Sequence, residues 1–269
     1  MPGAPSRSRS DGLSSAEPLA PRAPSTSSPA MSPPVLLERS GAVLTATLDR
    51  PQRLNAFDTT MRDALFEALD LARSDGTVDV LVVRGNGRAF SSGGDLAEFG
   101  TAPSPVRARD VRRVRDLWGT WSRLPCVSIA AVHGIAAGGG FEMALLCDLV
   151  VCADDARFWL PETALGLLPG VGGTQTLPRA VGPGRAAGVL LAGDEIDAAG
   201  ALRLGIATEV VPARGLRRRV ARLADEIAAR PRDAVRAAKA AVARGLDLPL
   251  HRALGLERRL ALGLGRRQP

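Results

Sequence analysis

The stretch that decides the fold is Ala130–Val151, AAVHGIAAGGGFEMALLCDLVV. The apolar run Cys126–Val132 leads into it and is short enough to be a buried strand. Three glycines, Gly138–Gly140, then open an apolar helix, and Leu149–Cys152 forms a second short strand. Strand, glycine-rich turn, helix and strand in this order predict an α/β unit with parallel strands.

The residues on the N-terminal side of this stretch repeat the alternation of strand and helix. Val43–Leu48 alternates like a half-buried strand, and Val78–Arg84 is a short β-branched run typical of a buried one. Between them, Asp58 or Thr59 can cap a helix. The apolar residues of that helix recur at helical spacing: Met61, Leu65, Phe66, Leu69 and Ala72. The pattern predicts an α/β fold with largely parallel pairing over residues 35–212, and from Ala187 onward the signals are almost wholly helical.

Composition narrows the classes of protein that fit. Residues 1–34 are a Ser/Pro/Ala/Arg mixture that cannot bury enough apolar surface to order, so we expect a disordered tail. The three cysteines form no CxxC pair and only two histidines are present, which excludes a zinc site of ordinary ligand spacing. No apolar run is long enough to span a membrane. An odd cysteine count without a signal peptide favours a reducing compartment, and we expect a cytoplasmic protein.

Two glycine-rich segments carry the first hint of chemistry: Phe90–Leu96 (FSSGGDL) and His133–Glu142 (HGIAAGGGFE). Glycines at a strand-to-helix junction allow a ligand to approach the main chain and leave first-turn N–H groups free. Such donors stabilise negative charge that develops on an oxygen atom. Neither segment has the spacing of a dinucleotide or P-loop fingerprint. Tight packing of helix against sheet is an equally good explanation of either segment alone.

Two glutamates sharpen this hypothesis. Glu142 falls in the first turn of the helix that the three glycines open, and Glu162 follows Pro161, which suits the first position of another helix. The intervening residues can run out as a strand and return, which would bring both carboxylates together. Water addition needs one carboxylate that activates water and another that holds the water or delivers a proton. The alternative is that both are ordinary first-turn glutamates that interact with a helix dipole.

Longer motifs identify a family. From residue 36 to about 250 the chain resembles the enoyl-CoA hydratase/isomerase (crotonase) superfamily almost without gaps. The resemblance rests on five segments in the same order: Arg50–Ala56, Ala89–Leu96, Ala130–Val151, Phe158–Gly182 and Leu191–Pro212. It implies a spiral of ββα units over residues 35–212 and a C-terminal helical region over residues 213–269, usually assembled as trimers or pairs of trimers.

The resemblance also implies roles for individual residues. The N–H groups of Gly94 and Gly139 would form an oxyanion hole for a thioester carbonyl. Glu162 would activate water for attack on a trans-2-enoyl-CoA, and Glu142 would orient that water. Residues that would line the CoA and acyl path are Arg53, Asn55, Ala56, Gly94, Asp95, Leu96, Ala97 and Gly139. No metal and no separate cofactor are expected, since coenzyme A enters as part of the substrate in fatty acid metabolism.

Departures from the family pattern keep alternatives open. Ala97 stands where many relatives carry a basic residue, and His133 stands where asparagine is common. Gly263 and Gly265 predict that no sturdy helix closes the chain, so that the C-terminal region is shortened. The alternatives are therefore an enoyl-CoA isomerase, or an inactive or RNA-binding relative favoured by the net charge of +7.

Overall fold

The computed structural model describes residues 33–98, 101, 104 and 114–265. The predicted tail at residues 1–34 lies outside the described residues except for its last two, Pro33 and Pro34. Within the part of the chain that the structure describes, no helix combines the length and apolar character needed to cross a bilayer.

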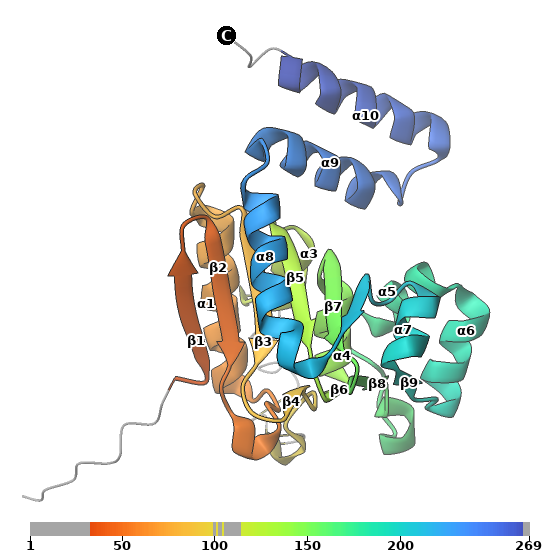
Figure 1. Ribbon diagram of the computed structural model, residues 1–269. Helices are drawn as coiled ribbons and strands as arrows, with labels where there is room; N and C mark the ends of the chain where they lie inside the picture. The colour runs from red at the N-terminus through yellow and green to blue at the C-terminus, as the bar shows by residue number, and fades with distance from the viewer. Residues whose placement is uncertain (1–32, 99–100, 102–103, 105–113, 266–269) are drawn as a thin grey trace, which may run out of the picture. The chain divides into compact units, whose positions relative to one another are not determined.

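A six-stranded sheet runs through the core in the order β1-β2-β3-β5-β7-β10 (Figure 1). β1 and β2 are antiparallel, and every other neighbouring pair is parallel. The strands are β1 (Val35–Ser40), β2 (Val43–Leu48), β3 (Val80–Gly85), β5 (Val127–Val132), β7 (Leu149–Ala153) and β10 (Glu209–Val211). A smaller sheet holds β4 (Ala89–Ser91), β6 (Ile135–Ala137), β8 (Arg157–Trp159) and β9 (Ile196–Asp197).

Alternating side chains of the large sheet feed two apolar layers. Val80 and Val82 of β3 belong to one core cluster, while Leu81 and Val83 belong to the other. Successive side chains of a strand point to opposite faces, so a strand buried on both faces needs an unbroken apolar run. Figure 1 shows α8 (Leu216–Ala228) along one face and α1 (Thr59–Ser74) along the other.

The remaining helices extend these layers. They are α3 (Leu117–Ser122), α4 (Gly139–Leu146), α5 (Gly173–Val181), α6 (Pro183–Ala187), α7 (Ala198–Leu204), α9 (Arg232–Gly245) and α10 (Leu250–Gly265). Among the described residues, single turns lie between these elements. They are the 3₁₀ turns η1 (Pro51–Arg53), η2 (Leu96–Glu98), η3 (Glu162–Leu165) and η5 (Ala213–Gly215), and the π turn η4 (Gly188–Ala192). The predicted cap of α1 is confirmed, because the Asp58 carboxylate accepts the Met61 N–H at 2.8 Å.

The C-terminal region after Ala187 is helical, as predicted, apart from the short strands β9 and β10. One prediction about this region was wrong. A regular helix covers Gly263 and Gly265, because α10 packs along α9 and buries Leu256. Each glycine costs a helix about 1 kcal/mol relative to alanine, and burial of one leucine offsets more than that.

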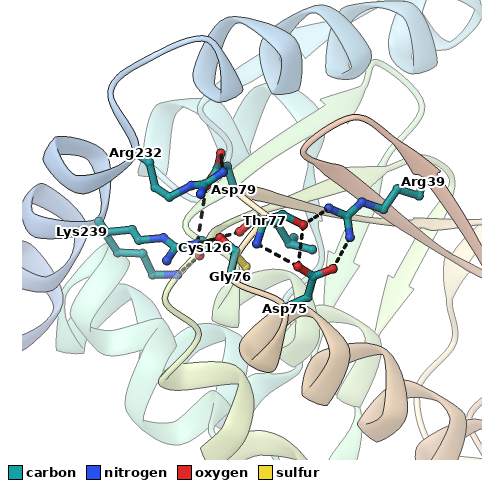
Figure 2. A network of polar contacts seen from close by, with 10 residues as sticks. Arg39, Asp75, Gly76, Thr77, Asp79, Cys126, Arg232 and Lys239 are labelled. Atoms are coloured by element: carbon teal, nitrogen blue, oxygen red, sulfur yellow. Dashed lines mark hydrogen bonds and ion pairs between the residues drawn. The ribbon is translucent and has the colours of Figure 1, made fainter.

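Polar contacts join α9 to the strand ends beneath it (Figure 2). Arg232 pairs with Asp79, next to the first residue of β3, and Lys239 donates to the Cys126 carbonyl at 2.6 Å and to Asp148 at 2.7 Å. Arg236 adds a bond to the Val78 carbonyl at 2.9 Å. No side chain of α9 is fully buried. The attachment of this helix therefore combines these polar contacts with the packing of the partly buried Val235 against the core.

Candidate active site

The two glycine-rich segments predicted from the sequence lie against each other. Gly93 has φ +90°, and a Cβ there would lie 2.7 Å from the Ala137 carbonyl oxygen and 3.0 Å from the Gly139 nitrogen. Only glycine permits both this backbone conformation and this approach. The segment around Gly94 is thereby brought to the N-terminal end of α4.

Phe57 holds Gly94 through hydrogen bonds to the residues before and after it. The Phe57 N–H donates to the Gly93 carbonyl at 2.8 Å, and the Asp95 N–H donates to the Phe57 carbonyl at 3.0 Å. The bridge between Phe57 and Gly94 is parallel, so the Gly94 N–H takes no part in it. Because the carbonyl of the same peptide unit accepts a hydrogen bond, its N–H becomes a better donor.

Gly139 supplies the second main-chain donor. It is the first residue of α4, and the first intrahelical bond runs from the Glu142 N–H to the Gly138 carbonyl at 3.0 Å. The Gly139 N–H therefore precedes every acceptor that the helix provides. The partial positive charge of a helix N-terminus favours an anionic oxygen in this position.

Glu142 is a buried carboxylate with fixed geometry. Its residue is 1% exposed, and its Oε1 accepts N–H bonds from Val171 at 2.9 Å and from Gly173 at 2.7 Å. Burial raises the pKa of the Glu142 carboxyl to about 7; the Gly173 and Val171 donors act in the opposite direction, and the charge of Glu162 adds to the rise. The two carboxylates predicted to meet are thus close enough to interact electrostatically.

Glu162 lies against the Gly138 backbone. A Cβ on Gly138 would be 2.7 Å from Glu162 Oε1, so the carboxylate occupies the space that the missing side chain leaves. Burial raises its pKa, and Oε2 is buried with no hydrogen-bond partner among the described residues. Such an atom favours a polar ligand atom beside it. The predicted α-helix after Pro161 is instead the 3₁₀ turn η3, with Pro161 as its N-cap.

The residues expected along the substrate path have different environments. Arg53 and Ala97 are exposed, and Leu96 presents 62% of its surface next to Gly94 and Asp95. Ala56 is buried immediately before Phe57.

Asn55 does not present its side chain to a ligand. It is fully buried in a left-handed conformation, with φ +55°. Its amide donates to the carbonyls of Asn86 (2.9 Å) and Ala89 (2.8 Å), and its Oδ1 accepts the Arg50 N–H at 2.9 Å. A side chain satisfied in this way braces the loop. The place of Asn55 along the CoA path stays a prediction.

Several residues at the site carried no sequence signal. The Phe57 ring edge would lie 2.6 Å from a Cβ on Gly139, and the ring makes an edge contact with Trp118 at 5.7 Å between centroids. Val171 and Gly173 bind Glu142 through main-chain N–H groups that any residue type would supply. Only the run of glycines around position 172 could have suggested such a turn. His133 Nε2 donates a hydrogen bond to the Gly87 carbonyl at 2.9 Å.

A metal centre has no support within the described ranges. No group of three or more His, Cys, Asp or Glu side chains there is arranged to hold an ion.

Comparison with known proteins places the chain among CoA-thioester enzymes by sequence similarity. The family model described as enoyl-CoA hydratase/isomerase matches residues 38–266. The 2,3-dehydroadipyl-CoA hydratase of Escherichia coli (strain K12) is 38% identical over 208 residues, which cover 77% of this chain and 81% of that protein. The 1,2-epoxyphenylacetyl-CoA isomerase of the same organism is 38% identical over 70% of this chain and 74% of that protein.

Solved structures show the same arrangement. The crystal structure of an enoyl-CoA hydratase from Bacillus anthracis has a TM-score of 0.82 at 32% identity, covering 87% of this chain and 92% of that one. The α/β core with its ββα units and helical C-terminal region is thus the crotonase fold. The chain belongs to the enoyl-CoA hydratase/isomerase family.

Proposed function

We propose that this protein adds water across the C2=C3 bond of a trans-2-enoyl-CoA. The observation that carries the proposal is the placement of two carboxyl groups, Glu142 and Glu162, around the N-terminal glycines of α4. Main-chain donors for a thioester oxygen and two carboxyl groups for a water molecule are the parts that hydration requires.

The two carboxyl groups have different surroundings and therefore different tasks. Glu142 is fixed through Oε1 by two N–H groups, which leaves Oε2 to orient a water molecule. Glu162 Oε2 has no partner in the described chain, so it is the better base. A raised pKa suits a group that takes a proton near neutral pH and gives it back.

The reaction then proceeds through an enolate. The water oxygen bonds to Cβ as Glu162 takes a proton, and the C2=C3 electron pair moves toward the thioester carbonyl. The N–H groups of Gly94 and Gly139 stabilise the resulting oxyanion. Return of a proton from a carboxyl group to Cα completes the hydroxyacyl-CoA. One oxyanion donor is worth about 3 kcal/mol of barrier in enzymes of this kind.

The direct test follows the loss of enoyl absorbance of crotonyl-CoA with wild type, Glu142→Gln and Glu162→Gln. We expect turnover by the wild type and a loss of about 10²–10⁴-fold in each variant, the usual contribution of a general acid or base. Arg73→Gln, on an exposed face of α1, serves as the matched control. Full activity in either glutamine variant would contradict the assignment.

Isomerisation is the second candidate function. One relative at 38% identity is a 1,2-epoxyphenylacetyl-CoA isomerase, and a pair of carboxyl groups can move a proton between two carbons as well as add water. CoA binding without turnover of crotonyl-CoA would favour this function. The absence of both turnover and CoA binding would favour an inactive or RNA-binding relative. Measurement of RNA binding at two salt concentrations would then test that alternative.

The proposal includes self-assembly and requires no cofactor beyond the CoA of the substrate. The α9–α10 hairpin exposes large apolar side chains: Val242, Leu246, Leu250, Leu254 and Leu262. Surfaces of this kind mark sites of association. We expect a trimer or a pair of trimers, and light scattering of the purified chain would show a monomer if this is wrong.

A further inference from the structure

Arg50 sits at the centre of a charged cluster behind the Gly94 loop. Its guanidinium is 18% exposed and lies 3.1 Å from both the Asp58 and the Asp95 carboxylates. Its Nη1 also donates to the Ala56 carbonyl at 2.5 Å. One cation thus joins the N-terminal cap of α1, the strand-like segment before it and the loop that carries Gly94.

These contacts lead directly to the oxyanion donor. Asp95 is the residue after Gly94, and its N–H donates to Phe57, the residue after Ala56. Arg50 therefore binds both chain segments of this parallel pairing: Ala56 through its carbonyl and Asp95 through its carboxylate. Each of these two residues is directly adjacent to the Phe57–Gly94 bridge.

The cluster depends on charge as well as on geometry. Asp58 and Asp95 side chains are 19% and 14% exposed and share a single guanidinium nitrogen. Burial acts to raise the pKa of Asp95, but the Ala97 N–H and the Arg50 guanidinium outweigh it and hold the pKa below its ordinary value. Without Arg50, two partly buried carboxylates would lose their shared ion pair, with only the charge of Arg53 still acting on Asp95. Their repulsion would push the Gly94 loop away from α1.

We infer that Arg50 is a positioning residue for the Gly94 oxyanion donor, acting through Asp95 and the Ala56 carbonyl. The inference rests on the proposed function, because it concerns the same thioester site. A displacement of about 1 Å at a reacting centre can cost about 10²-fold in rate. Arg50 variants should therefore lose kcat, while KM for an acyl-CoA changes less, because remote parts of the substrate supply most ground-state binding.

The test reads the donor spectroscopically as well as by rate. Wild type, Arg50→Gln, Arg50→Lys and the control Arg73→Gln are each mixed with butyryl-CoA that carries a ¹³C-labelled thioester carbonyl. Infrared difference spectra then report how strongly the site polarises that carbonyl, and circular dichroism checks the fold. We expect a shift to lower frequency in wild type and Arg73→Gln, most of it lost in Arg50→Gln, with kcat toward crotonyl-CoA about 10- to 100-fold lower. Arg50→Lys keeps the charge without the planar fork and should fall between.

A second substitution isolates the role of charge. Arg50→Gln/Asp95→Asn removes one of the two facing carboxylates, so it should regain part of the shift and of kcat that Arg50→Gln loses. An unaltered carbonyl shift in Arg50→Gln would overturn the inference about Arg50 and leave the proposed function standing. The same holds if the double variant shows no larger carbonyl shift and no higher kcat than Arg50→Gln. If Arg50→Gln does not fold, the same comparison applies to Arg50→Lys and its Asp95→Asn double variant. Bound butyryl-CoA with no shift in wild type would overturn the proposed oxyanion site itself.

Discussion

Carboxylates near the two ends of the parallel strands in the large sheet have opposite surroundings. At the edge where the strands begin, Asp79 pairs with Arg232 and Asp148 pairs with Lys239. Beyond the edge where the strands end, Glu142 and Glu162 receive main-chain N–H groups or no partner at all, and burial raises the pKa of both. A carboxylate beside a cation holds elements together, whereas one buried without a cation is prepared to exchange a proton.

The difference should appear most strongly in the pH dependence of stability. The folded pKa of Glu142 is about 7, against an ordinary value of 4.5 for a glutamate carboxyl. Its contribution to stability is therefore fully present below pH 4.5 and is lost as pH rises through 7. A shift of this size corresponds to about 3 kcal/mol of unfolding free energy.

Urea unfolding of wild type and Glu142→Gln across this range measures the effect. We expect the wild type to lose stability between pH 4.5 and 7, and Glu142→Gln to lose much less. The opposite edge provides a contrast, since Thr77 and Arg39 lower the pKa of Asp75 to about 2. That group contributes stability above pH 3.8 that is lost as pH falls through 2. Parallel curves for wild type and Glu142→Gln would show that Glu142 is not held in its buried site.

The position of Glu162 can be disturbed without replacing either glutamate. Gly138→Ala places a methyl group 2.7 Å from Glu162 Oε1 at a residue with φ +51°. The carboxylate must move, and we expect about 10²-fold lower kcat toward crotonyl-CoA. Gly166→Ala is the control, because Gly166 also has positive φ (+70°) but a Cβ there would meet no atom within 4 Å. Equal losses in both variants would attribute the effect to backbone strain rather than to Glu162.

The smallest effect is expected at the edge where the strands begin. Lys239→Met removes the cation from Asp148 and the donor from the Cys126 carbonyl. We expect a loss of about 1–2 kcal/mol in urea unfolding and less dependence of stability on salt, with unchanged activity per folded molecule. Arg73→Ala removes an exposed pair with Asp70 and should cost at most about 0.5 kcal/mol. A large loss of kcat in Lys239→Met would show that the two edges are coupled.

Part of the candidate site could be predicted from the sequence because some of its residues lie close together along the chain. Gly139 and Glu142 share one helical turn, so their relation follows from helix geometry alone. The strand expected at Val78–Arg84 appears as Val80–Gly85 because a β-branched run of that length fits a sheet buried on both faces. Local reasoning does not reach the contacts of the Asn55 amide, which donates to the Asn86 and Ala89 carbonyls more than 30 residues away.

By itself, the sequence determined the alternation of strands and helices, the two glycine-rich turns and the family, because each depends on residue type at short spacing. Tertiary structure alone decided how the parts act together. It placed Glu162 over Gly138, brought the N–H groups of Val171 and Gly173 to Glu142, and joined Arg50 to both Asp58 and Asp95. The physical reason is that burial and the pKa of a carboxyl group depend on every neighbour in space, and no local pattern encodes neighbours that the fold supplies.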